Sequence, residues 1–327
     1  MGWSLVPTRL PVAVSNNAVA SVTTARGASL VSMMGLSAAK THADIVRTTM
    51  TWAEGTPSFQ TQSPTPGPLG RIAASAVGVQ SSVLLFGGYT VAADGHETSV
   101  PDVQRFDLDA AAWSPFSTMP VPVDDAVIDV WRDRAVLVSG WSNVDNVAHV
   151  QWLHTETGQW STGTPITGPA VFGHAGGVLG DTIIYCDGVR RASTAPKYRA
   201  VDACFRGDID PGHPEDIAWT PIASHPGPAR YRMAAGTYEE RGWLVFAGGT
   251  ANPYNYDGIG YNGVPSQPVR DVFAWDGTNW LELPPLPEPM MDHRGLVEVS
   301  GSLYLVGGLD GAREPSDRIY RFGPQPD

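Results

Sequence analysis

The chain has 327 residues, of which 42% are hydrophobic, and it carries a formal net charge of −12. This charge disfavours a nucleic-acid backbone or an anionic membrane as a partner, and no apolar run reaches the ~18 residues that a membrane helix requires. The 36 glycines and 28 prolines indicate many turns and little helix, so we expect an all-β protein.

Two features alternate along the whole chain. Six tryptophans recur at intervals of 47 to 61 residues, and each is followed closely by proline. They are Trp3, Trp52, Trp113, Trp160, Trp219 and Trp280. Apolar strands that end in glycine lie between them, at residues 29–35, 83–88, 135–140, 182–188, 243–249 and 302–308. A period of this length suits one four-stranded blade with its loops, and we expect all six tryptophans at equivalent places.

The segment from Arg270 to Gly311 shows the repeated unit most completely. An aromatic run leads to Asp276-Gly277, where a tight turn is expected, and Trp280 begins the next strand. A proline-rich connection cannot join a central ladder, and an apolar strand closed by two glycines follows. This order of elements is the kelch motif. The chain resembles the kelch β-propellers over its whole length.

The ends of the chain complete one another in this pattern. The sixth unit stops after the aromatic strand RIYRFG, whereas Trp3 begins the chain in a tryptophan strand that has no blade of its own. We therefore expect a six-bladed kelch-type β-propeller in which the N-terminal strand completes the C-terminal blade, which removes exposed sheet edges. The whole chain forms a single domain in this reading. Its approximate units are 12–70, 71–123, 124–172, 173–229, 230–291 and 292–327 with 1–11.

The two cysteines and the N-terminus bear on the compartment. Cys186 and Cys204 are expected on strands of the same blade but not facing each other, so we predict reduced, buried thiols. No signal peptide precedes Trp3, which favours the cytoplasm, or the periplasm or cell exterior if an export signal was removed.

Functional groups should collect at the start of each inner strand, because these positions open on one funnel of a propeller. The chain carries polar residues at all six starts: Asn16, Asn17, Arg71, Asp124, Asp125, His174, Arg230, Arg232, Asp292, His293 and Arg294. Arginines can bind a carboxylate or phosphate in a bidentate manner, so the cluster predicts a pocket for an anionic small molecule. Each single arginine could instead bind backbone carbonyls and lock the blades.

The loops after the glycines are the second place for function. The longest, at residues 250–271, interleaves tyrosine and asparagine with glycine. Tyr254, Tyr256, Tyr261 and Asn262 would suit a carbohydrate, since aromatic faces stack on sugar rings and amides bind hydroxyls. The alternative is a loop that packs on its own blade.

The fourth unit carries Asp187 where other units have glycine, with several basic residues after it. Asp187 could act as an acid/base group at the funnel mouth, or it could be a turn aspartate that bonds its own backbone. Here the chain also resembles the bacterial sialic acid mutarotases (N-acetylneuraminate epimerases), through the circular arrangement of blades, IIYCDG…YRAVDACF, and FAGG before the long loop. That resemblance implies Asp187 as the acid/base residue and Arg199 as the carboxylate anchor.

These observations lead to a functional hypothesis. We expect an isomerase of the mutarotase or epimerase type that acts on a polar, anionic or sugar-like small molecule. Asp187, His174 and His293 would be catalytic, and Arg71, Arg199, Arg230, Arg232, Arg294, Asp125, Asn17 and the loop residues would bind substrate. We expect no cofactor, no metal, and no nucleic-acid or membrane partner. The alternatives are a non-catalytic propeller that binds a protein or carbohydrate, and an isomerase or lyase for another metabolite.

Overall fold

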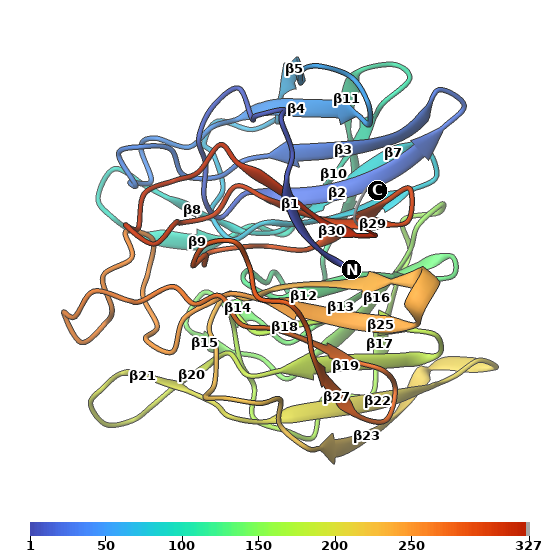
Figure 1. Cartoon of the computed structure of the whole chain (residues 1–327). Helices are drawn as coiled ribbons and strands as arrows, with labels where there is room; N and C mark the ends of the chain where they lie inside the picture. The colour runs from blue at the N-terminus through green and yellow to red at the C-terminus, as the bar shows by residue number, and fades with distance from the viewer. Residues whose placement is uncertain (325–327) are drawn as a thin grey trace.

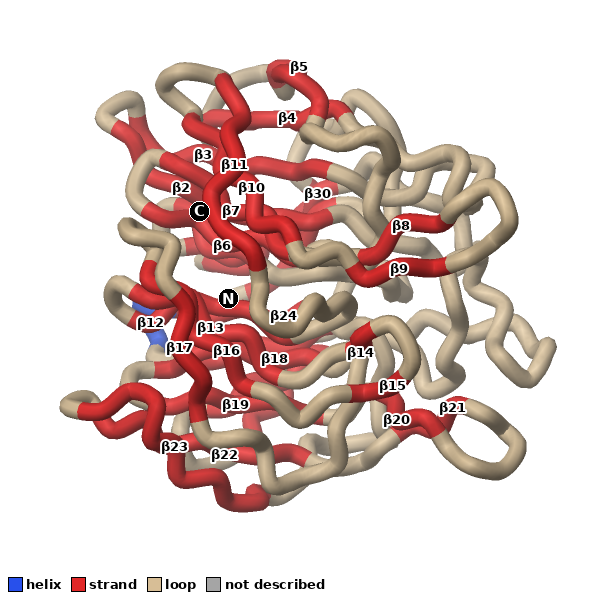
Figure 2. The backbone as a smooth tube through the Cα atoms, turned by 180° about the vertical axis from the view of Figure 1, so that it is seen from behind, coloured by secondary structure: helices blue, strands red, loops and turns tan. Residues whose placement is uncertain are grey.

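The computed structural model describes residues 1–324, which form six four-stranded antiparallel sheets (Figures 1 and 2). The innermost strands β2, β6, β12, β18, β24 and β28 contact one another in this order, and β28 returns to β2, so that they surround a central channel. The predicted all-β, six-bladed propeller is confirmed. The described residues include one short 3₁₀ helix, η1 (Glu239–Arg241).

The first three blades follow one another along the chain, each from the innermost strand outwards. Blade 1 comprises β2 (Ala18–Thr24), β3 (Gly27–Met33), β4 (Thr48–Ala53) and β5 (Gln60–Pro64). Blade 2 comprises β6 (Ser75–Val79), β7 (Ser82–Phe86), β10 (Asp102–Asp107) and β11 (Ala112–Thr118). Blade 3 comprises β12 (Val127–Trp131), β13 (Arg134–Val138), β16 (Val150–His154) and β17 (Trp160–Gly163).

The remaining blades complete the ring. Blade 4 comprises β18 (Ala175–Leu179), β19 (Thr182–Cys186), β22 (Cys204–Asp210) and β23 (His213–Ile222). Blade 5 comprises β24 (Ala234–Tyr238), β25 (Trp243–Ala247), β26 (Val272–Trp275) and β27 (Trp280–Glu282). Blade 6 comprises β28 (Val297–Val299), β29 (Ser302–Val306), β30 (Ile319–Gly323) and β1 (Gly2–Leu5). The N-terminal strand β1 pairs with β30, Trp3 opposite Phe322, as the sequence pattern predicted.

Three short hairpins extend from the same face of the ring, which lies at the left in Figure 1 and at the right in Figure 2. We call it the upper face. They are β8 (Tyr89–Val91) with β9 (Glu97–Ser99), β14 (Trp141–Ser142) with β15 (Asp145–Asn146), and β20 (Val189–Arg191) with β21 (Tyr198–Ala200). Each leaves the second strand of blade 2, 3 or 4 and returns to the third. The hairpins therefore build walls around the upper end of the channel.

Five of the six tryptophans occupy equivalent places on the outermost strand, and the sixth does not. The indole N–H of each of the five donates a hydrogen bond to the preceding blade; Trp280 Nε1, for example, bonds the Ala223 carbonyl at 2.7 Å. Trp52 instead lies on the third strand, β4, and bonds Thr56 of its own blade. The expectation for Trp52 is wrong, because the fourth strand of blade 1 begins only at Gln60.

The glycine pairs bring each blade against the next. Gly87 and Gly248 both have positive φ, and a Cβ added to them would lie 2.2 Å from the Val123 carbonyl oxygen and 2.4 Å from that of Met290. Neither approach leaves space for a side chain, which explains the glycine. The packing of neighbouring blades thus fixes part of the kelch pattern.

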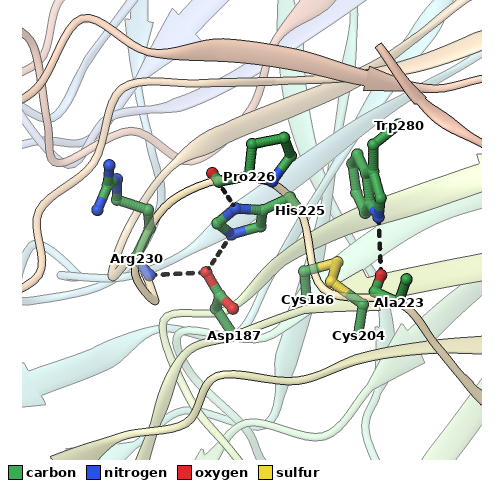
Figure 3. The surroundings of a disulfide bond; sticks show 8 residues. All are labelled: Cys186, Asp187, Cys204, Ala223, His225, Pro226, Arg230 and Trp280. Atoms are coloured by element: carbon green, nitrogen blue, oxygen red, sulfur yellow. Dashed lines mark hydrogen bonds and ion pairs between the residues drawn. A yellow bond between two sulfur atoms is a disulfide. The ribbon is translucent and has the colours of Figure 1, made fainter. Parts of the chain in front are cut away.

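The predicted reduced thiols are a wrong expectation. Cys186 of β19 and Cys204 of β22 lie directly opposite each other in the ladder, with their Cα atoms 4.1 Å apart, and they form a disulfide (Figure 3). Directly opposed residues on neighbouring antiparallel strands point to the same face of the sheet. The sequence offsets could not reveal this register, because they depend on the length of the β20–β21 hairpin.

Candidate functional site

A ring of six residues closes the upper end of the channel, one from just before each inner strand. This throat ring consists of Asn16, Ala73, Asp125, Gly173, Arg232 and Asp292. All six have φ between 52° and 68°, which residues other than glycine seldom adopt. Four of them donate their backbone N–H to the carbonyl of the ring residue in the preceding blade, at 2.8–3.1 Å. The Ala73 N–H bonds the Asn16 side chain at 2.6 Å. The positive-φ conformation of these six residues therefore links each blade to the next and directs their side chains towards the axis of the ring.

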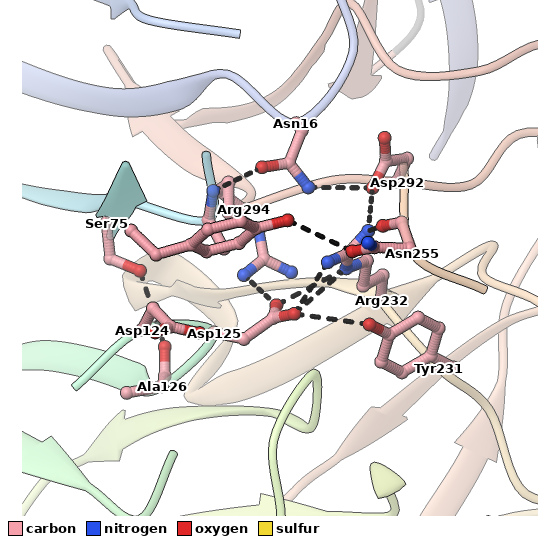
Figure 4. A network of polar contacts seen from close by, with 12 residues as sticks. Asn16, Ser75, Asp124, Asp125, Ala126, Tyr231, Arg232, Asn255, Asp292 and Arg294 are labelled. Carbon is pink, nitrogen blue, oxygen red and sulfur yellow. Dashed lines mark hydrogen bonds and ion pairs between the residues drawn. The ribbon is translucent and has the colours of Figure 1, made fainter. Parts of the chain in front are cut away.

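The side chains of the throat ring form a charge-balanced network (Figure 4). The Arg232 guanidinium donates to Asp125 at 2.7 Å and to Asp292 at 3.1 Å. It also donates to the Asn255 carbonyl of the long loop at 2.5 Å. Arg294 binds the other oxygen of Asp125, and all of these side chains except Asn255 are almost completely buried. Two arginines and two carboxylates thus neutralise one another.

Burial and the arginines act in opposite directions on Asp125. Burial alone would raise the pKa of its carboxyl, but Arg232 and Arg294 outweigh burial and lower this pKa to about 2. The carboxylates and Tyr231 in turn raise the pKa of Arg232 well above its usual value, against the effect of burial. Both groups remain charged at neutral pH. The network of Asp125, Asp292, Arg232 and Arg294 lies across the channel, and we call it the floor.

An upper cavity lies above this floor, enclosed by the hairpins and the long loop. Its aromatic lining consists of Tyr89, Trp141, Phe172, Tyr198 and Tyr261. Its polar lining outside the floor consists of Glu97, Ser99, Asp124, Asn143 and Asn255. Aromatic walls with a few convergent polar groups are typical of small-molecule sites. This cavity is the candidate functional site.

Asp124 is the polar group of the cavity with the most unusual surroundings. Its side chain is buried, and it accepts a hydrogen bond from the Ser99 hydroxyl at 2.6 Å. Within residues 1–324 no cation lies at ion-pair distance from it. Burial raises the pKa of Asp124 well above its usual range; Asp125 and Glu97 add to the rise, and the Ser99 bond opposes it. Asp124 is therefore suited to carry a proton at neutral pH.

The channel below the floor has a different lining. Small residues of the six inner strands surround much of it, together with the acidic residues Asp129, Glu239 and Glu298, and His174, His293 and Arg294 lie at its upper end. Burial lowers the pKa of His174 to about 4, although a hydrogen bond with the Val138 carbonyl opposes the change. Burial and Arg294 lower the pKa of His293 to about 3. Both histidines are neutral at pH 7 and lie on the far side of the floor from Asp124.

Three residues predicted to bind substrate have structural contacts instead. Arg71 bonds the Gly87 carbonyl and pairs with Asp102, and Arg230 pairs in the same way with Asp271 of its own blade. Asn17 donates to the Ser32 hydroxyl and the Val306 carbonyl. Their side chains point along the sheets and not into either cavity, which corrects the expectation that all residues at the inner-strand starts face one funnel.

Asp187 and Arg199 also lie apart from both cavities. Asp187 is 1% exposed and accepts bonds from the His225 ring and the Arg230 backbone N–H, both at 2.6 Å (Figure 3). It occupies the place of the first glycine of a pair, and its side chain enters the seam between blades 4 and 5. Arg199 is exposed on β21 and bonds Thr194 and Ala195 of its own hairpin. The expected position of Asp187 at the mouth of the funnel is wrong.

The long loop contributes one of its four predicted residues to the cavity lining. Tyr261 lines the cavity. Tyr254 is fully buried beneath it against Tyr231, with rings 5.5 Å apart. Tyr256 packs against the apolar cluster around Tyr89, and Asn262 bonds Asn252 within the loop. The loop is therefore partly a ligand wall and partly self-packed.

Sequence reasoning missed most of the aromatic wall. Tyr89 and Trp141 each follow the glycine that closes the second strand, and Phe172 precedes the throat residue Gly173. Tyr198 lies in the basic stretch of unit four, between Lys197 and Arg199, and no motif marks it. The signal that could have found the first two is a large aromatic residue directly after the closing glycine of a kelch strand.

Residues 1–324 contain no cluster of three or more histidine, cysteine or acidic side chains arranged to hold a metal ion. The same residues contain no helix long and apolar enough to cross a membrane.

The fold is a six-bladed β-propeller with a candidate small-molecule site at one end of its channel, and comparisons with known proteins agree with this fold. No protein-family model matches the chain. Kelch domain-containing protein 3 from Bos taurus is 27% identical over 264 residues, which cover 73% of this chain and 64% of that protein. The match thus spans less than two thirds of that relative. The solved structure of YjhT has a TM-score of 0.76 at 16% identity and covers 95% of both chains.

Proposed function

We propose that the upper cavity binds a sugar-like small molecule and catalyses its mutarotation, with Asp124 and Glu97 as the acid/base pair. The observation that carries this proposal is Asp124: a buried carboxyl that faces a cavity, has no cation partner within residues 1–324 and has a raised pKa. Perturbed carboxyls in clefts are frequent at catalytic sites. Asp124 takes the role that the sequence pattern suggested for Asp187.

The lining of the cavity supports a sugar as ligand. Sugars present apolar C–H faces and a rim of hydroxyls, and the cavity offers flat rings beside the polar side chains of Asn143, Asn255 and Ser99. Arg232 makes all of its bonds to Asp125, Asp292 and Asn255, so it has no free edge for a substrate carboxylate. The geometry favours a sugar without an anionic group over the acidic ligand expected from the sequence.

The reaction needs two proton transfers. Protonated Asp124 donates to the ring oxygen while the exposed Glu97 carboxylate removes the proton of the anomeric hydroxyl. The bond from the anomeric carbon to the ring oxygen then breaks, and that carbon becomes a carbonyl. After rotation about the adjacent carbon–carbon bond, the reverse transfers close the ring on the other face and restore both carboxyl groups. Each general acid/base event contributes about 10²–10⁴-fold.

The resemblance to the sialic acid mutarotases adds support at the level of reaction type. The resemblance rests on the sequence features given above, and the solved structure of YjhT has the same propeller fold as this chain. Its likeness to this chain concerns the fold, so the residues proposed here rest on the cavity itself. The shared architecture makes ring opening and closure the first reaction to test.

The test is anomer exchange, followed by saturation-transfer NMR with D-glucose, D-galactose and sialic acid. We expect faster exchange of a neutral sugar and at least a ~10²-fold loss of the catalysed rate in Asp124→Asn, which retains an acceptor for the Ser99 hydroxyl. Glu282→Gln, an exposed carboxylate on the outer strand β27, is the matched control and should leave the rate unchanged. Equal rates in wild type and Asp124→Asn would refute the assignment. Binding without exchange would identify a carbohydrate-binding propeller.

We also propose that the protein works in an oxidising compartment rather than in the cytoplasm. The support is the buried Cys186–Cys204 bond, because structural disulfides persist mainly outside reducing compartments. Protein isolated from its native source in the presence of a thiol-blocking reagent should show no labelled cysteine after denaturation, until a reductant is added. Two labelled thiols before reduction would contradict the proposal.

A further inference from the structure

We infer that the ligand of the upper cavity carries a protonated amine, and that an amino sugar is its substrate class. The inference rests on the proposed function for the site and adds the charge of the ligand. Three observations carry it: the connected aromatic wall, the cations that lie against Tyr198 of this wall and against the neighbouring Tyr231, and two carboxyl groups that have no partner cation within residues 1–324.

The aromatic wall is continuous across three blades. The Trp141 ring meets Phe172 at 5.6 Å and Tyr198 at 5.9 Å, both edge to face, and the Tyr198 and Tyr261 centroids are 4.3 Å apart. Tyr89 lines the same cavity from blade 2. The negative faces of aromatic rings attract cations, and aromatic cages are a recurrent solution for ammonium ligands.

Cations of the chain itself already lie against this aromatic cluster. The Lys197 ammonium is 5.0 Å from the centre of the Tyr198 ring. Beneath the cavity, the Arg232 guanidinium is 4.8 Å from the centre of Tyr231, whose ring packs on Phe172 at 5.7 Å. Aromatic rings thus contact a cation at the rim of the cavity and another beneath it. The rings that line the cavity between these two places are open to a ligand.

The charges around the cavity complement an amine. Glu97 and Asp124 line it, and neither has a cation at ion-pair distance within residues 1–324. The two arginines of the throat network, Arg232 and Arg294, are balanced by Asp125 and Asp292. An ammonium group would therefore find the uncompensated carboxylate of Glu97, with the neutral carboxyl of Asp124 as a hydrogen-bond acceptor beside it, whereas an anion would find no free guanidinium among the described residues of the lining.

The basic hairpin β20–β21 does not reverse this balance. Arg191 pairs with Asp145 of the neighbouring hairpin, and Arg199 bonds Thr194 and Ala195 of its own. Lys197 is exposed at the rim and is absent from the cavity lining. The wall itself carries Glu97, Asp124, Asp125 and Arg232 as its charged or titratable acidic and basic groups, so a ligand that enters the cavity meets an excess of acidic residues.

The experiment compares three sugars that differ at one position: D-glucosamine, N-acetyl-D-glucosamine and D-glucose. Binding is measured by titration calorimetry at about pH 6.5, below the usual pKa of an α-amino group. Glucosamine should bind at least ~10-fold more tightly than either neutral sugar, since cation–π contacts and a nearby carboxylate both favour the ammonium. In the anomer-exchange assay, glucosamine should also reach half-maximal rate at the lowest concentration.

Two variants and one control connect this preference to the wall. Glu97→Gln and Trp141→Leu should each bring glucosamine to the affinity of glucose, while Glu282→Gln, which removes the same charge far from the cavity, should keep the ~10-fold preference. Glu97 is exposed, so its variant tests the inference even if Trp141→Leu does not fold.

The outcomes separate the inference from the proposed function. Accelerated exchange of glucose with no preference for glucosamine would overturn the inference and leave mutarotation standing. Preferential binding of glucosamine that is lost in Glu97→Gln, but without faster anomer exchange, would support the inference and overturn mutarotation. No binding of any of the three sugars at millimolar concentration would overturn both.

Discussion

The two ends of the central channel are bounded by the same ring of residues, yet their linings differ. Above the throat ring, loops and hairpins provide large aromatic rings and, at Asp124, a carboxyl without a partner cation within residues 1–324. Below it, the inner strands and the segments beside them provide alanine, glycine and valine, the acidic residues Asp129, Glu239 and Glu298, and two histidines that burial keeps neutral. The upper lining thus contains five aromatic side chains, whereas the lower lining, among the described residues, contains no phenylalanine, tyrosine or tryptophan.

The difference arises from what each part must do for the fold. Six inner strands converge below the throat, so small residues are required where neighbouring strands approach most closely: a Cβ on Gly236, for instance, would lie 1.8 Å from the Leu296 carbonyl oxygen of the next blade. The hairpins above the throat lie outside this convergence and have space for large side chains such as Trp141 and Tyr198. Binding groups therefore accumulate on loops held by a rigid scaffold.

Removal of Arg232 should have the largest effect, because its side chain connects the two carboxylates of the floor between the two ends of the channel. Arg232→Met leaves Asp125 and Asp292 buried with fewer partners, and breaking a buried ion pair costs about 3–5 kcal/mol. We expect a loss of that size in the free energy of unfolding, measured by urea denaturation. Arg26→Gln disrupts the exposed pair with Asp109 and should cost less than ~1 kcal/mol. Similar losses in the two variants would show that the throat network does not support the fold.

Protonation of His174, which lies below the throat, should have a smaller effect on the stability of the fold. The folded-state pKa of His174 is lowered to about 4, so the folded protein binds fewer protons than the unfolded chain. Its contribution to stability is present above the usual histidine pKa near 6.5 and is lost as the pH falls towards 4. We expect His174→Gln to reduce the acid-induced loss of unfolding free energy between about pH 7 and pH 5 by roughly 2 kcal/mol.

Comparison of His174→Gln with wild type separates the effect of His174 on the pH dependence of stability from the effects of other titratable groups. Burial raises the pKa of Asp129, which also lines the lower channel, to about 6, so protonation of Asp129 favours the folded state as the pH falls. That contribution is common to wild type and variant. The exposed His213→Gln is the matched control. If it changes the pH dependence as much as His174→Gln does, burial of His174 is not the cause.

The repeat allowed the fold to be predicted, because the glycines and tryptophans of a kelch blade follow from contacts between blades. Trp280 and Gly248 are both readable in the sequence for this reason. Trp52 was misplaced because a tryptophan on the third strand has the same sequence surroundings as one on the fourth. The Cys186–Cys204 pairing depends on a ladder register that a hairpin of variable length conceals.

The site was less predictable, since two positions only two residues apart before each inner strand serve different purposes. Arg71 and Arg230 occupy the first of these positions and pair with an aspartate of their own blade, whereas Arg232, at the second, turns into the throat. The positive φ of the second position separates the two, and the sequence does not reveal it at an arginine. The aromatic wall comes from four separate segments, and their convergence follows from the ring and not from any local pattern.

Closure of the ring by the two ends of the chain has a consequence for biosynthesis. Among the described residues, strand β1 pairs with β30, more than 300 residues later in the sequence, from Gly2 opposite Gly323 to Leu5 opposite Tyr320. During translation β1 is made before all the other strands of its sheet, and blade 6 lacks its outermost strand until β30 has been made. Long-range pairing of this kind is slow and leaves sheet edges exposed. The propeller thus cannot close until the ribosome has passed β30.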